Sequence, residues 1–186
     1  MINPDLTEYF VSSEILAQGK LLTVLCDQVR LANGHFTQRE YVMHPGAVLI
    51  VPILANGHVI LERQFRYPLR QVFIELPAGK IDANEDVLHT GQREMLEETG
   101  YSANEWVRLG QTHPCIGYSN EVIHIYLARN LTIGNHQRDV DENLEVFTLP
   151  FVECLNMIVQ GEITDGKTIV ALFLADQFLK SEATYG

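Results

Sequence analysis

The amino-acid sequence predicts a mixed fold of the α/β (α+β) class. Two Asn-Gly pairs separate short apolar runs in the first third of the chain, a pattern that is typical of β-hairpins. A segment with helical periodicity follows them, and strand-like runs then return before two further helical segments. The order strands, helix, strands and helices indicates one core built from both kinds of element.

The first predicted strands are organised by turn residues. Asn33-Gly34 and Asn56-Gly57 each lie between two apolar runs, and both residue types tolerate the positive φ that a type I′ turn requires. A last short strand in this part ends at Pro77-Ala78-Gly79. The predicted strands cover residues 21–31, 36–43, 47–54, 58–65 and 71–76.

The spacing of apolar residues changes to that of a helix over residues 84–99. Val87, Leu88, Gly91 and Met95 recur at helical spacing, and acidic residues fill the other face. We expect Asn84 to be the N-cap and Gly100 to be the C′ residue. Further strands are expected over 105–111, 122–128 and 144–149, and helices near 151–160 and 166–180.

The first 43 residues are predicted to be a separate small domain. They contain two or three strands with little apolar mass of their own, and a sheet of that size needs a partner surface to be stable. His44-Pro45-Gly46 has the composition of a joint. We therefore predict an N-terminal β-strand domain of residues 1–43, packed on the main domain or on a second subunit, and a main domain of residues 44–186.

Composition and charge exclude several classes of function. The chain has 186 residues, a net charge of −11 and a pI near 5.0, so it has no basic surface for duplex nucleic acid or for an anionic membrane. Its apolar runs are far shorter than the roughly 20 residues of a membrane-spanning helix. Three widely spaced cysteines suit a reducing compartment. We expect a cytoplasmic protein without nucleic-acid or membrane partners.

The predicted helix ends in a cluster of acidic residues. Glu94, Glu97 and Glu98 share one face of its last two turns, where each like-charge pair costs about 0.2–0.5 kcal/mol and each acid opposes the helix dipole by about 0.3–1 kcal/mol. A solvated acidic face is one interpretation. The other is a site for divalent cations: oxygen ligands favour Mg²⁺ or Mn²⁺, and such ions would let an acidic protein bind a diphosphate.

A longer pattern favours the metal site. Gly79, Glu85 and the run Arg93–Tyr101 match G-x5-E-x7-R-E-U-x-E-E-x-G-U, where U is a bulky apolar residue, with tyrosine as a mild departure at the last position. On this motif the chain resembles the Nudix hydrolases, and within them the ADP-ribose pyrophosphatase branch. Matching flanks lie at residues 39–46, 64–66, 75–79, 117–121 and 165–168.

The resemblance implies a fold, an assembly and an activity. The fold would be an α/β/α sandwich around a mixed sheet, with a small N-terminal antiparallel strand domain that is commonly exchanged across a homodimer. The activity would be hydrolysis of the diphosphate bond of ADP-ribose to AMP and ribose 5-phosphate, with Mg²⁺, or Mn²⁺ in its place, as cofactor. The partner would be a small nucleoside diphosphate sugar.

The resemblance also implies roles for individual residues. Glu94 and Glu98 would be the principal metal ligands, supported by Glu97, and Glu85 would ligate or orient. Arg93 would hold these glutamates through ion pairs, and the carbonyl of Ala78 would supply a further oxygen. Residues implied in substrate binding are Arg66, Glu75, Gly117 and Arg39.

The general base would lie outside the motif, on an acidic loop before a late strand. We predict Glu142, which would position and deprotonate the attacking water. Asp141 and Glu145 are the alternatives, and the loop could also be no more than an acidic surface segment.

The preferred nucleoside and sugar stay open at this point. Leu21 and Leu22 stand where a relative would carry an aromatic side chain against the base, so GDP-mannose or another nucleoside diphosphate sugar is an alternative substrate. A non-catalytic sensor of ADP-ribose-type ligands is a further alternative, although every glutamate of the motif is present. Isopentenyl diphosphate isomerase shares the fold, but its cysteine–glutamate chemistry has no clear counterpart here.

Overall fold

The computed structural model describes residues 5–134 and 143–185, and residues 1–4, 135–142 and 186 lie outside the described part. The chain divides into two compact units. One consists of Met1–Pro45 and Cys115–Glu121, and the other of Gly46–Pro114 and Val122–Gly186.

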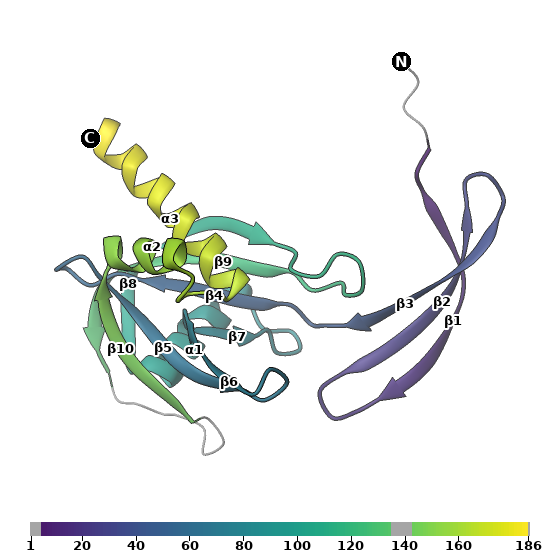
Figure 1. The fold of residues 1–186 in the computed structure, drawn as a ribbon, viewed down its shortest axis with the longest axis horizontal. Coiled ribbons are helices and arrows are strands. Elements are labelled where there is room, and N and C mark those ends of the chain that lie inside the picture. The colour runs from purple at the N-terminus through teal and green to yellow at the C-terminus, as the bar shows by residue number, and fades with distance from the viewer. Residues whose placement is uncertain (1–4, 135–142, 186) are drawn as a thin grey trace. The chain divides into compact units, whose positions relative to one another are not determined.

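The N-terminal unit is an antiparallel sheet in the order β1-β2-β3 (Figure 1). Segment 115–121 joins this unit, because the backbone N–H of Val42 donates to the carbonyl of Tyr118 at 2.9 Å. The strands are β1 (Glu8–Gln18), β2 (Thr23–Leu31) and β3 (Phe36–Met43).

Both Asn-Gly hairpins form, but the predicted type I′ turn is wrong. Gly34 and Gly57 have positive φ (87° and 79°), whereas neither asparagine does. In the first hairpin the N–H of Gly34 donates to the carbonyl of Leu31 at 2.9 Å, and the N–H of Leu31 donates to the carbonyl of His35 at 2.8 Å. This arrangement is a three-residue loop whose left-handed glycine forms a bulge, so only the glycine needs its conformational freedom.

The main unit contains a four-stranded mixed sheet and a three-stranded antiparallel sheet. The orders are β7-β4-β9-β8, in which β4 and β9 are parallel, and β10-β5-β6. The strands are β4 (Ala47–Pro52), β5 (His58–Arg66), β6 (Gln71–Glu75), β7 (Ala78–Lys80), β8 (Tyr101–Thr112), β9 (Ile123–Ile133) and β10 (Leu144–Pro150). The helices are α1 (Val87–Thr99), α2 (Phe151–Gln160) and α3 (Gly166–Tyr185).

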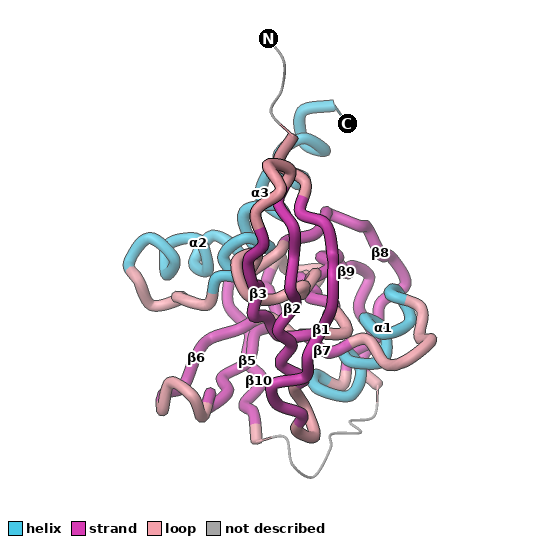
Figure 2. Tube along the Cα trace, turned by 90° about the vertical axis from the view of Figure 1, so that its right-hand side faces the viewer, coloured by secondary structure: helices cyan, strands magenta, loops and turns pink. Residues whose placement is uncertain are grey.

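The core lies on both faces of β4, all of whose residues are buried. Leu49 belongs to the hydrophobic cluster that contains Leu172 of α3 and Cys154 of α2, whereas Ile50 packs in a second cluster with Met95 of α1. Helix α1 and helix α2 therefore cover opposite faces of the strands (Figure 2). The predicted mixed fold class and its α/β/α layers are confirmed.

The N-cap of helix α1 lies two residues later than predicted. Asp86 is the N-cap, and its carboxylate accepts hydrogen bonds from the N–H groups of Leu88 (2.9 Å) and His89 (3.2 Å). Asn84 lies in the preceding loop with φ 68°. Gly100 ends the helix in the left-handed conformation, as predicted. In the described ranges, no helix has the length and apolar character needed to cross a membrane.

Candidate active site

The carboxylate of Glu98 is fixed against the strand that follows the β6–β7 turn. Glu98 is buried in the last turn of α1, and its Oε2 accepts a hydrogen bond from the backbone N–H of Ala78 at 3.0 Å. Met95, one turn earlier, is fully buried beneath the helix. The packing of Met95 thus sets the rotation of α1 that brings Glu98 to the Ala78 backbone.

The carboxylate of Glu94 lies directly over Gly79. A Cβ atom at residue 79 would be 1.8 Å from Cδ and 2.0 Å from Oε1 of Glu94, distances that no side chain tolerates. The glycine is therefore required by this close approach of side chain to backbone. Glu94 and Glu98 together place two carboxylates on the Ala78-Gly79 segment.

Arg93 is the cation that holds the acidic face together. Its Nε and Nη2 donate to the two carboxylate oxygens of Glu85, each at 3.0 Å, while Nη1 contacts Glu97 at 2.8 Å and Glu94 at 2.9 Å. One guanidinium thus offsets part of the repulsion among three carboxylates. The excess of negative charge that remains favours a bound cation.

The same contacts shift the ionisation of Glu85. The hydrogen bonds from Arg93, with a further one from Thr90 Oγ1 at 2.8 Å, lower the pKa of Glu85 to about 2. The pKa of Arg93 is raised in turn by its bonds to Glu85. Both groups are charged throughout the physiological pH range.

The donor chemistry of this cluster fits a hard divalent cation. Every candidate ligand is an oxygen, from Glu94, Glu98, Glu85 or the carbonyl of Ala78, and such ligands suit Mg²⁺ or Mn²⁺. The glycine cradle at residue 79 leaves room for the Glu94 carboxylate beside that carbonyl. Among the described residues, no group of three or more Asp, Glu, His or Cys side chains is arranged so that it could hold a metal ion by itself.

A second charged cluster surrounds the buried carboxylate of Glu75. Arg66 donates to it from Nε and Nη2, each bond 2.7 Å long, and Lys167 contacts its Oε2. Burial raises the pKa of Glu75, but the hydrogen bonds and charges of Arg66 and Lys167 outweigh burial, so that the pKa is lowered. The sequence indicates a role in substrate binding for Arg66 and Glu75 but none for Lys167, which lies in the matching flank at residues 165–168.

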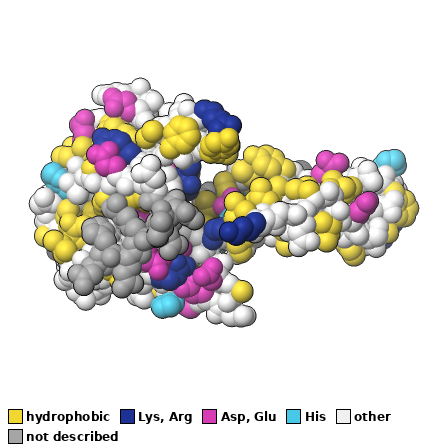
Figure 3. Space-filling model, turned by 90° about the horizontal axis from the view of Figure 1, so that it is seen from below, with side chains coloured by type: hydrophobic (Ala, Val, Ile, Leu, Met, Phe, Trp, Pro, Cys, Tyr) yellow, Lys and Arg dark blue, Asp and Glu magenta, His cyan; other side chains and the backbone are white. Residues whose placement is uncertain are grey.

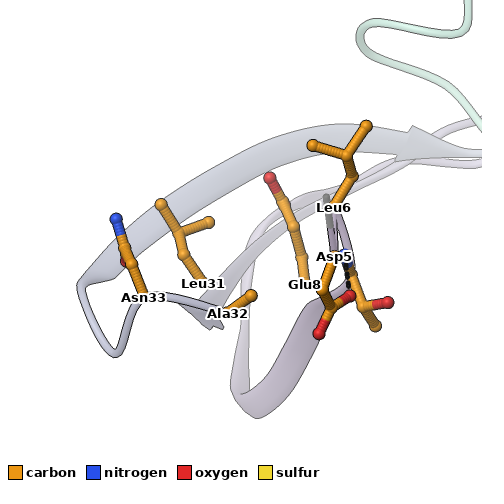
Figure 4. Close-up of a pocket in the computed structure, with 7 residues that line it drawn as sticks. Asp5, Leu6, Glu8, Leu31, Ala32 and Asn33 are labelled. Carbon is orange, nitrogen blue, oxygen red and sulfur yellow. Dashed lines mark hydrogen bonds between the residues drawn. The ribbon is translucent and has the colours of Figure 1, made fainter. Parts of the chain in front are cut away.

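Two predicted substrate residues, Arg39 and Gly117, lie in the N-terminal unit. Arg39 donates to both carboxylate oxygens of Glu8, at 2.9 and 2.6 Å. Glu8 lines a small pocket, in which Asp5 accepts a hydrogen bond from the N–H of Thr7 (Figure 4). A Cβ at Gly117 would meet no atom within 4 Å. The substrate-binding role of both residues stays a prediction.

The predicted general base, Glu142, lies outside the described residues, as does its alternative Asp141. The other alternative, Glu145, is exposed on β10, and its carboxylate pairs with Arg63 at 3.1 Å. The guanidinium of Arg63 stacks 3.9 Å from the ring centre of Phe147. The choice of Glu142 stays a prediction.

Comparison with known proteins shows which family this chain is similar to. The family model described as "NUDIX domain" matches residues 43–169. An ADP-ribose pyrophosphatase of Bacillus subtilis (strain 168) is 33% identical over 170 residues, which are 90% of this chain and 92% of the relative. A GDP-mannose pyrophosphatase of Yersinia enterocolitica is 35% identical over 136 residues, 68% of this chain and 71% of the relative. The crystal structure of an ADP compounds hydrolase superposes with a TM-score of 0.87 and 25% identity, over 97% of this chain and 98% of that one.

The Arg93 contacts predict how Glu85 titrates. In Arg93→Gln we expect the pKa of Glu85 to rise from about 2 toward its ordinary value of 4.5, because the hydrogen bonds and the charge that favour its carboxylate are lost. In the wild type, the stabilisation from Glu85 is fully present above about pH 4.5 and is lost as the pH falls toward 2. In Arg93→Gln, the free energy of unfolding should therefore fall less between pH 4.5 and 2 than in the wild type.

The measurement is the ¹³C shift of the Glu85 carboxyl carbon between pH 1.5 and 7, with urea unfolding at pH 3 and 6. Arg63→Gln is the matched control, since Arg63 pairs with Glu145 instead, and it should leave Glu85 unchanged. A Glu85 that still titrates near pH 2 in Arg93→Gln would contradict the assignment.

Proposed function

The chain belongs to the Nudix family and is a Nudix pyrophosphohydrolase, and from this premise we propose that it hydrolyses the diphosphate bond of ADP-ribose in the presence of Mg²⁺, with AMP and ribose 5-phosphate as products. The observation that carries the proposal is the pair of carboxylates, Glu94 and Glu98, packed on the Ala78-Gly79 backbone. The Bacillus subtilis relative supports the choice of substrate, because its similarity extends over 90% of this chain.

The residues that would hold Mg²⁺, or Mn²⁺ in its place, are Glu94, Glu98 and the carbonyl of Ala78, with Glu85 ligating or orienting beside them. When bound there, the ion would neutralise charge on the diphosphate and lower the pKa of a coordinated water. Arg93 and Glu97 contribute by keeping the glutamates ordered in the absence of substrate.

Arg66, the last residue of β5, would bind the diphosphate. A guanidinium gives two parallel charge-assisted hydrogen bonds to phosphate oxygens, and Arg66 is partly exposed, so a ligand can reach it. Glu142 would take the proton from the attacking water. The protein's part is then to position the diphosphate, offset its charge and remove one proton.

A panel of substrates tests the choice of ADP-ribose. With Mg²⁺, we expect ADP-ribose to be hydrolysed with a higher kcat/KM than GDP-mannose, UDP-glucose, NADH or a dinucleoside polyphosphate, as followed by chromatography of the products. The GDP-mannose pyrophosphatase relative makes GDP-mannose the alternative substrate. A preference for GDP-mannose would replace ADP-ribose in the proposal, and turnover of no compound would contradict the activity.

Substitution of Glu98 tests the metal site. We expect Glu98→Gln to lower kcat for ADP-ribose by about 10²–10³-fold, since the loss of one anionic ligand removes several kcal/mol of charge stabilisation. The amide oxygen can still accept the hydrogen bond from Ala78, so the thermal unfolding midpoint should change little. Glu153→Gln, an exposed glutamate on α2, is the control. Near-wild-type turnover of Glu98→Gln would remove Glu98 from the proposed ligands.

We further propose that the chain is a homodimer formed through its N-terminal sheet. Apolar side chains on this unit are exposed (Figure 3), and an accumulation of exposed apolar side chains is typical of a protein–protein contact surface. Those on β1–β3 and the β1–β2 turn are Tyr9, Phe10, Val11, Ile15, Leu16, Leu21, Leu22, Phe36 and Met43.

Light scattering after gel filtration should give a mass about twice the 21.1 kDa of one chain. Charges placed among these apolar side chains by Phe10→Lys and Ile15→Lys together should lower the mass toward that of a monomer, because burial of unpaired lysine charges in an apolar interface is costly. Gln38→Lys, a polar exposed position of β3, is the control. A wild-type mass of about 21 kDa would contradict the dimer.

A further inference from the structure

We propose that Lys167, in the first turn of α3, is a positioning residue that sets the orientation of Arg66 through the buried carboxylate of Glu75. The inference rests on the proposed function, in which Arg66 binds the diphosphate. It adds a determinant of substrate affinity from a helix that the family motif does not include.

Glu75 connects the two cations. It ends β6 with its side chain buried, and its Oε1 accepts a hydrogen bond from Nε of Arg66 at 2.7 Å. Its Oε2 accepts from Nη2 of Arg66 at 2.7 Å and also contacts Nζ of Lys167. Any rotation of the Glu75 carboxylate would therefore break contacts with both partners at once.

The bidentate bond determines which edge of Arg66 faces a ligand. A guanidinium has a rigid fork of five N–H donors, and Glu75 engages its Nε–Nη2 edge. The Nη1–Nη2 edge then lies at a fixed angle to the Glu75 carboxylate and can give two parallel bonds to phosphate oxygens. The side chain of Arg66 is 44% exposed, so a ligand can reach it. The orientation of the Glu75 carboxylate therefore determines the direction in which the Nη1–Nη2 edge of Arg66 points.

Lys167 is itself fixed by the start of α3. Its Nζ lies 2.9 Å from Oδ2 of Asp165, and the same oxygen accepts the N–H of Thr168 at 3.1 Å, as a helix-capping side chain does. The hydroxyl of Thr168 accepts the N–H of Leu76 at 3.0 Å. Lys167 and Thr168 of the helix are therefore bonded to Glu75 and Leu76 at the end of β6. These paired contacts hold the backbone of Lys167 in a fixed position.

Lys167 also favours binding of an anionic ligand through its charge. The cations Arg66 and Lys167 balance the carboxylates Glu75 and Asp165, with which they form ion pairs. Loss of Lys167 would leave an excess of negative charge beside Arg66, and that excess would oppose an anionic ligand.

The test compares substitutions of two lysines on the same helix. We expect Lys167→Met to raise KM for ADP-ribose about tenfold, the usual scale for a residue that orients a ligand-contacting group, with kcat changed by less than about threefold. Lys167→Arg should restore most of the affinity. Lys180→Met is the matched control: Lys180 is exposed and pairs with Asp176 at 2.6 Å, and its variant should keep wild-type constants.

A double-mutant cycle separates positioning from a general loss of stability. The single variant Arg66→Gln should raise KM. The double variant, with Lys167→Met added, should raise KM no further, because the effect of Lys167 passes through Arg66. A merely structural role would lower the unfolding midpoint and would act equally in both backgrounds. An unchanged KM in Lys167→Met, or the same KM increase in the Arg66→Gln background, would overturn the inference.

A second readout does not depend on catalysis. Exchange of the Arg66 Nε–H proton with solvent, measured by ¹⁵N NMR, should be slow in the wild type and in Lys180→Met but faster by about tenfold in Lys167→Met, because its bond to Glu75 is less constrained. If the wild type hydrolyses nothing in the panel, the proposed function fails while this measurement still decides the inference. Unchanged exchange in Lys167→Met would overturn it.

Discussion

The close approach of α1 to the backbone of Gly79 is the constraint on which the candidate site depends. The Glu94 carboxylate occupies the space of a Cβ atom, and the adjacent N–H of Ala78 is bonded to Glu98. The carbonyl of the preceding Pro77 accepts the N–H of Ile50, at the centre of the buried strand β4. One short segment therefore joins the helix that carries the acidic residues to the most buried strand of the main unit, and positions both carboxylates without any special conformation of α1.

Electrostatics and packing oppose each other in this helix. The acidic side chains at the end of α1 repel each other and oppose the helix dipole. Burial of Met95 and the capping contacts of Asp86 and Gly100 hold the helix in place, while Arg93 offsets part of the repulsion. The residual negative charge lowers the stability of this helix end, and it is the feature that would suit the proposed site to a cation.

The sequence allowed prediction of those features that depend on local chemistry. Gly100 at the end of α1 and the glycines of both hairpins occupy left-handed positions, as the residue type requires. The N-cap was wrong because Asn84 and Asp86 are both good capping residues, and only the path of the loop, with Asn84 at positive φ, decides between them. The contact of Lys167 with Glu75 spans 92 residues and depends on how α3 packs on the sheet, which no local pattern encodes.

The long sequence separation between Glu75 and Lys167 has a consequence for synthesis. A nascent chain exposes the glutamates of α1, the Gly79 cradle and Arg66 while the residues of α3 are still inside the ribosomal tunnel. The buried carboxylate of Glu75 then has one of its two cationic partners, and its neighbour Leu76 lacks the hydroxyl of Thr168. The proposed anion-binding side of the site would therefore be completed only when α3 docks, so that a polypeptide interrupted before residue 167 carries the acidic motif but lacks the lysine that we propose orients Arg66.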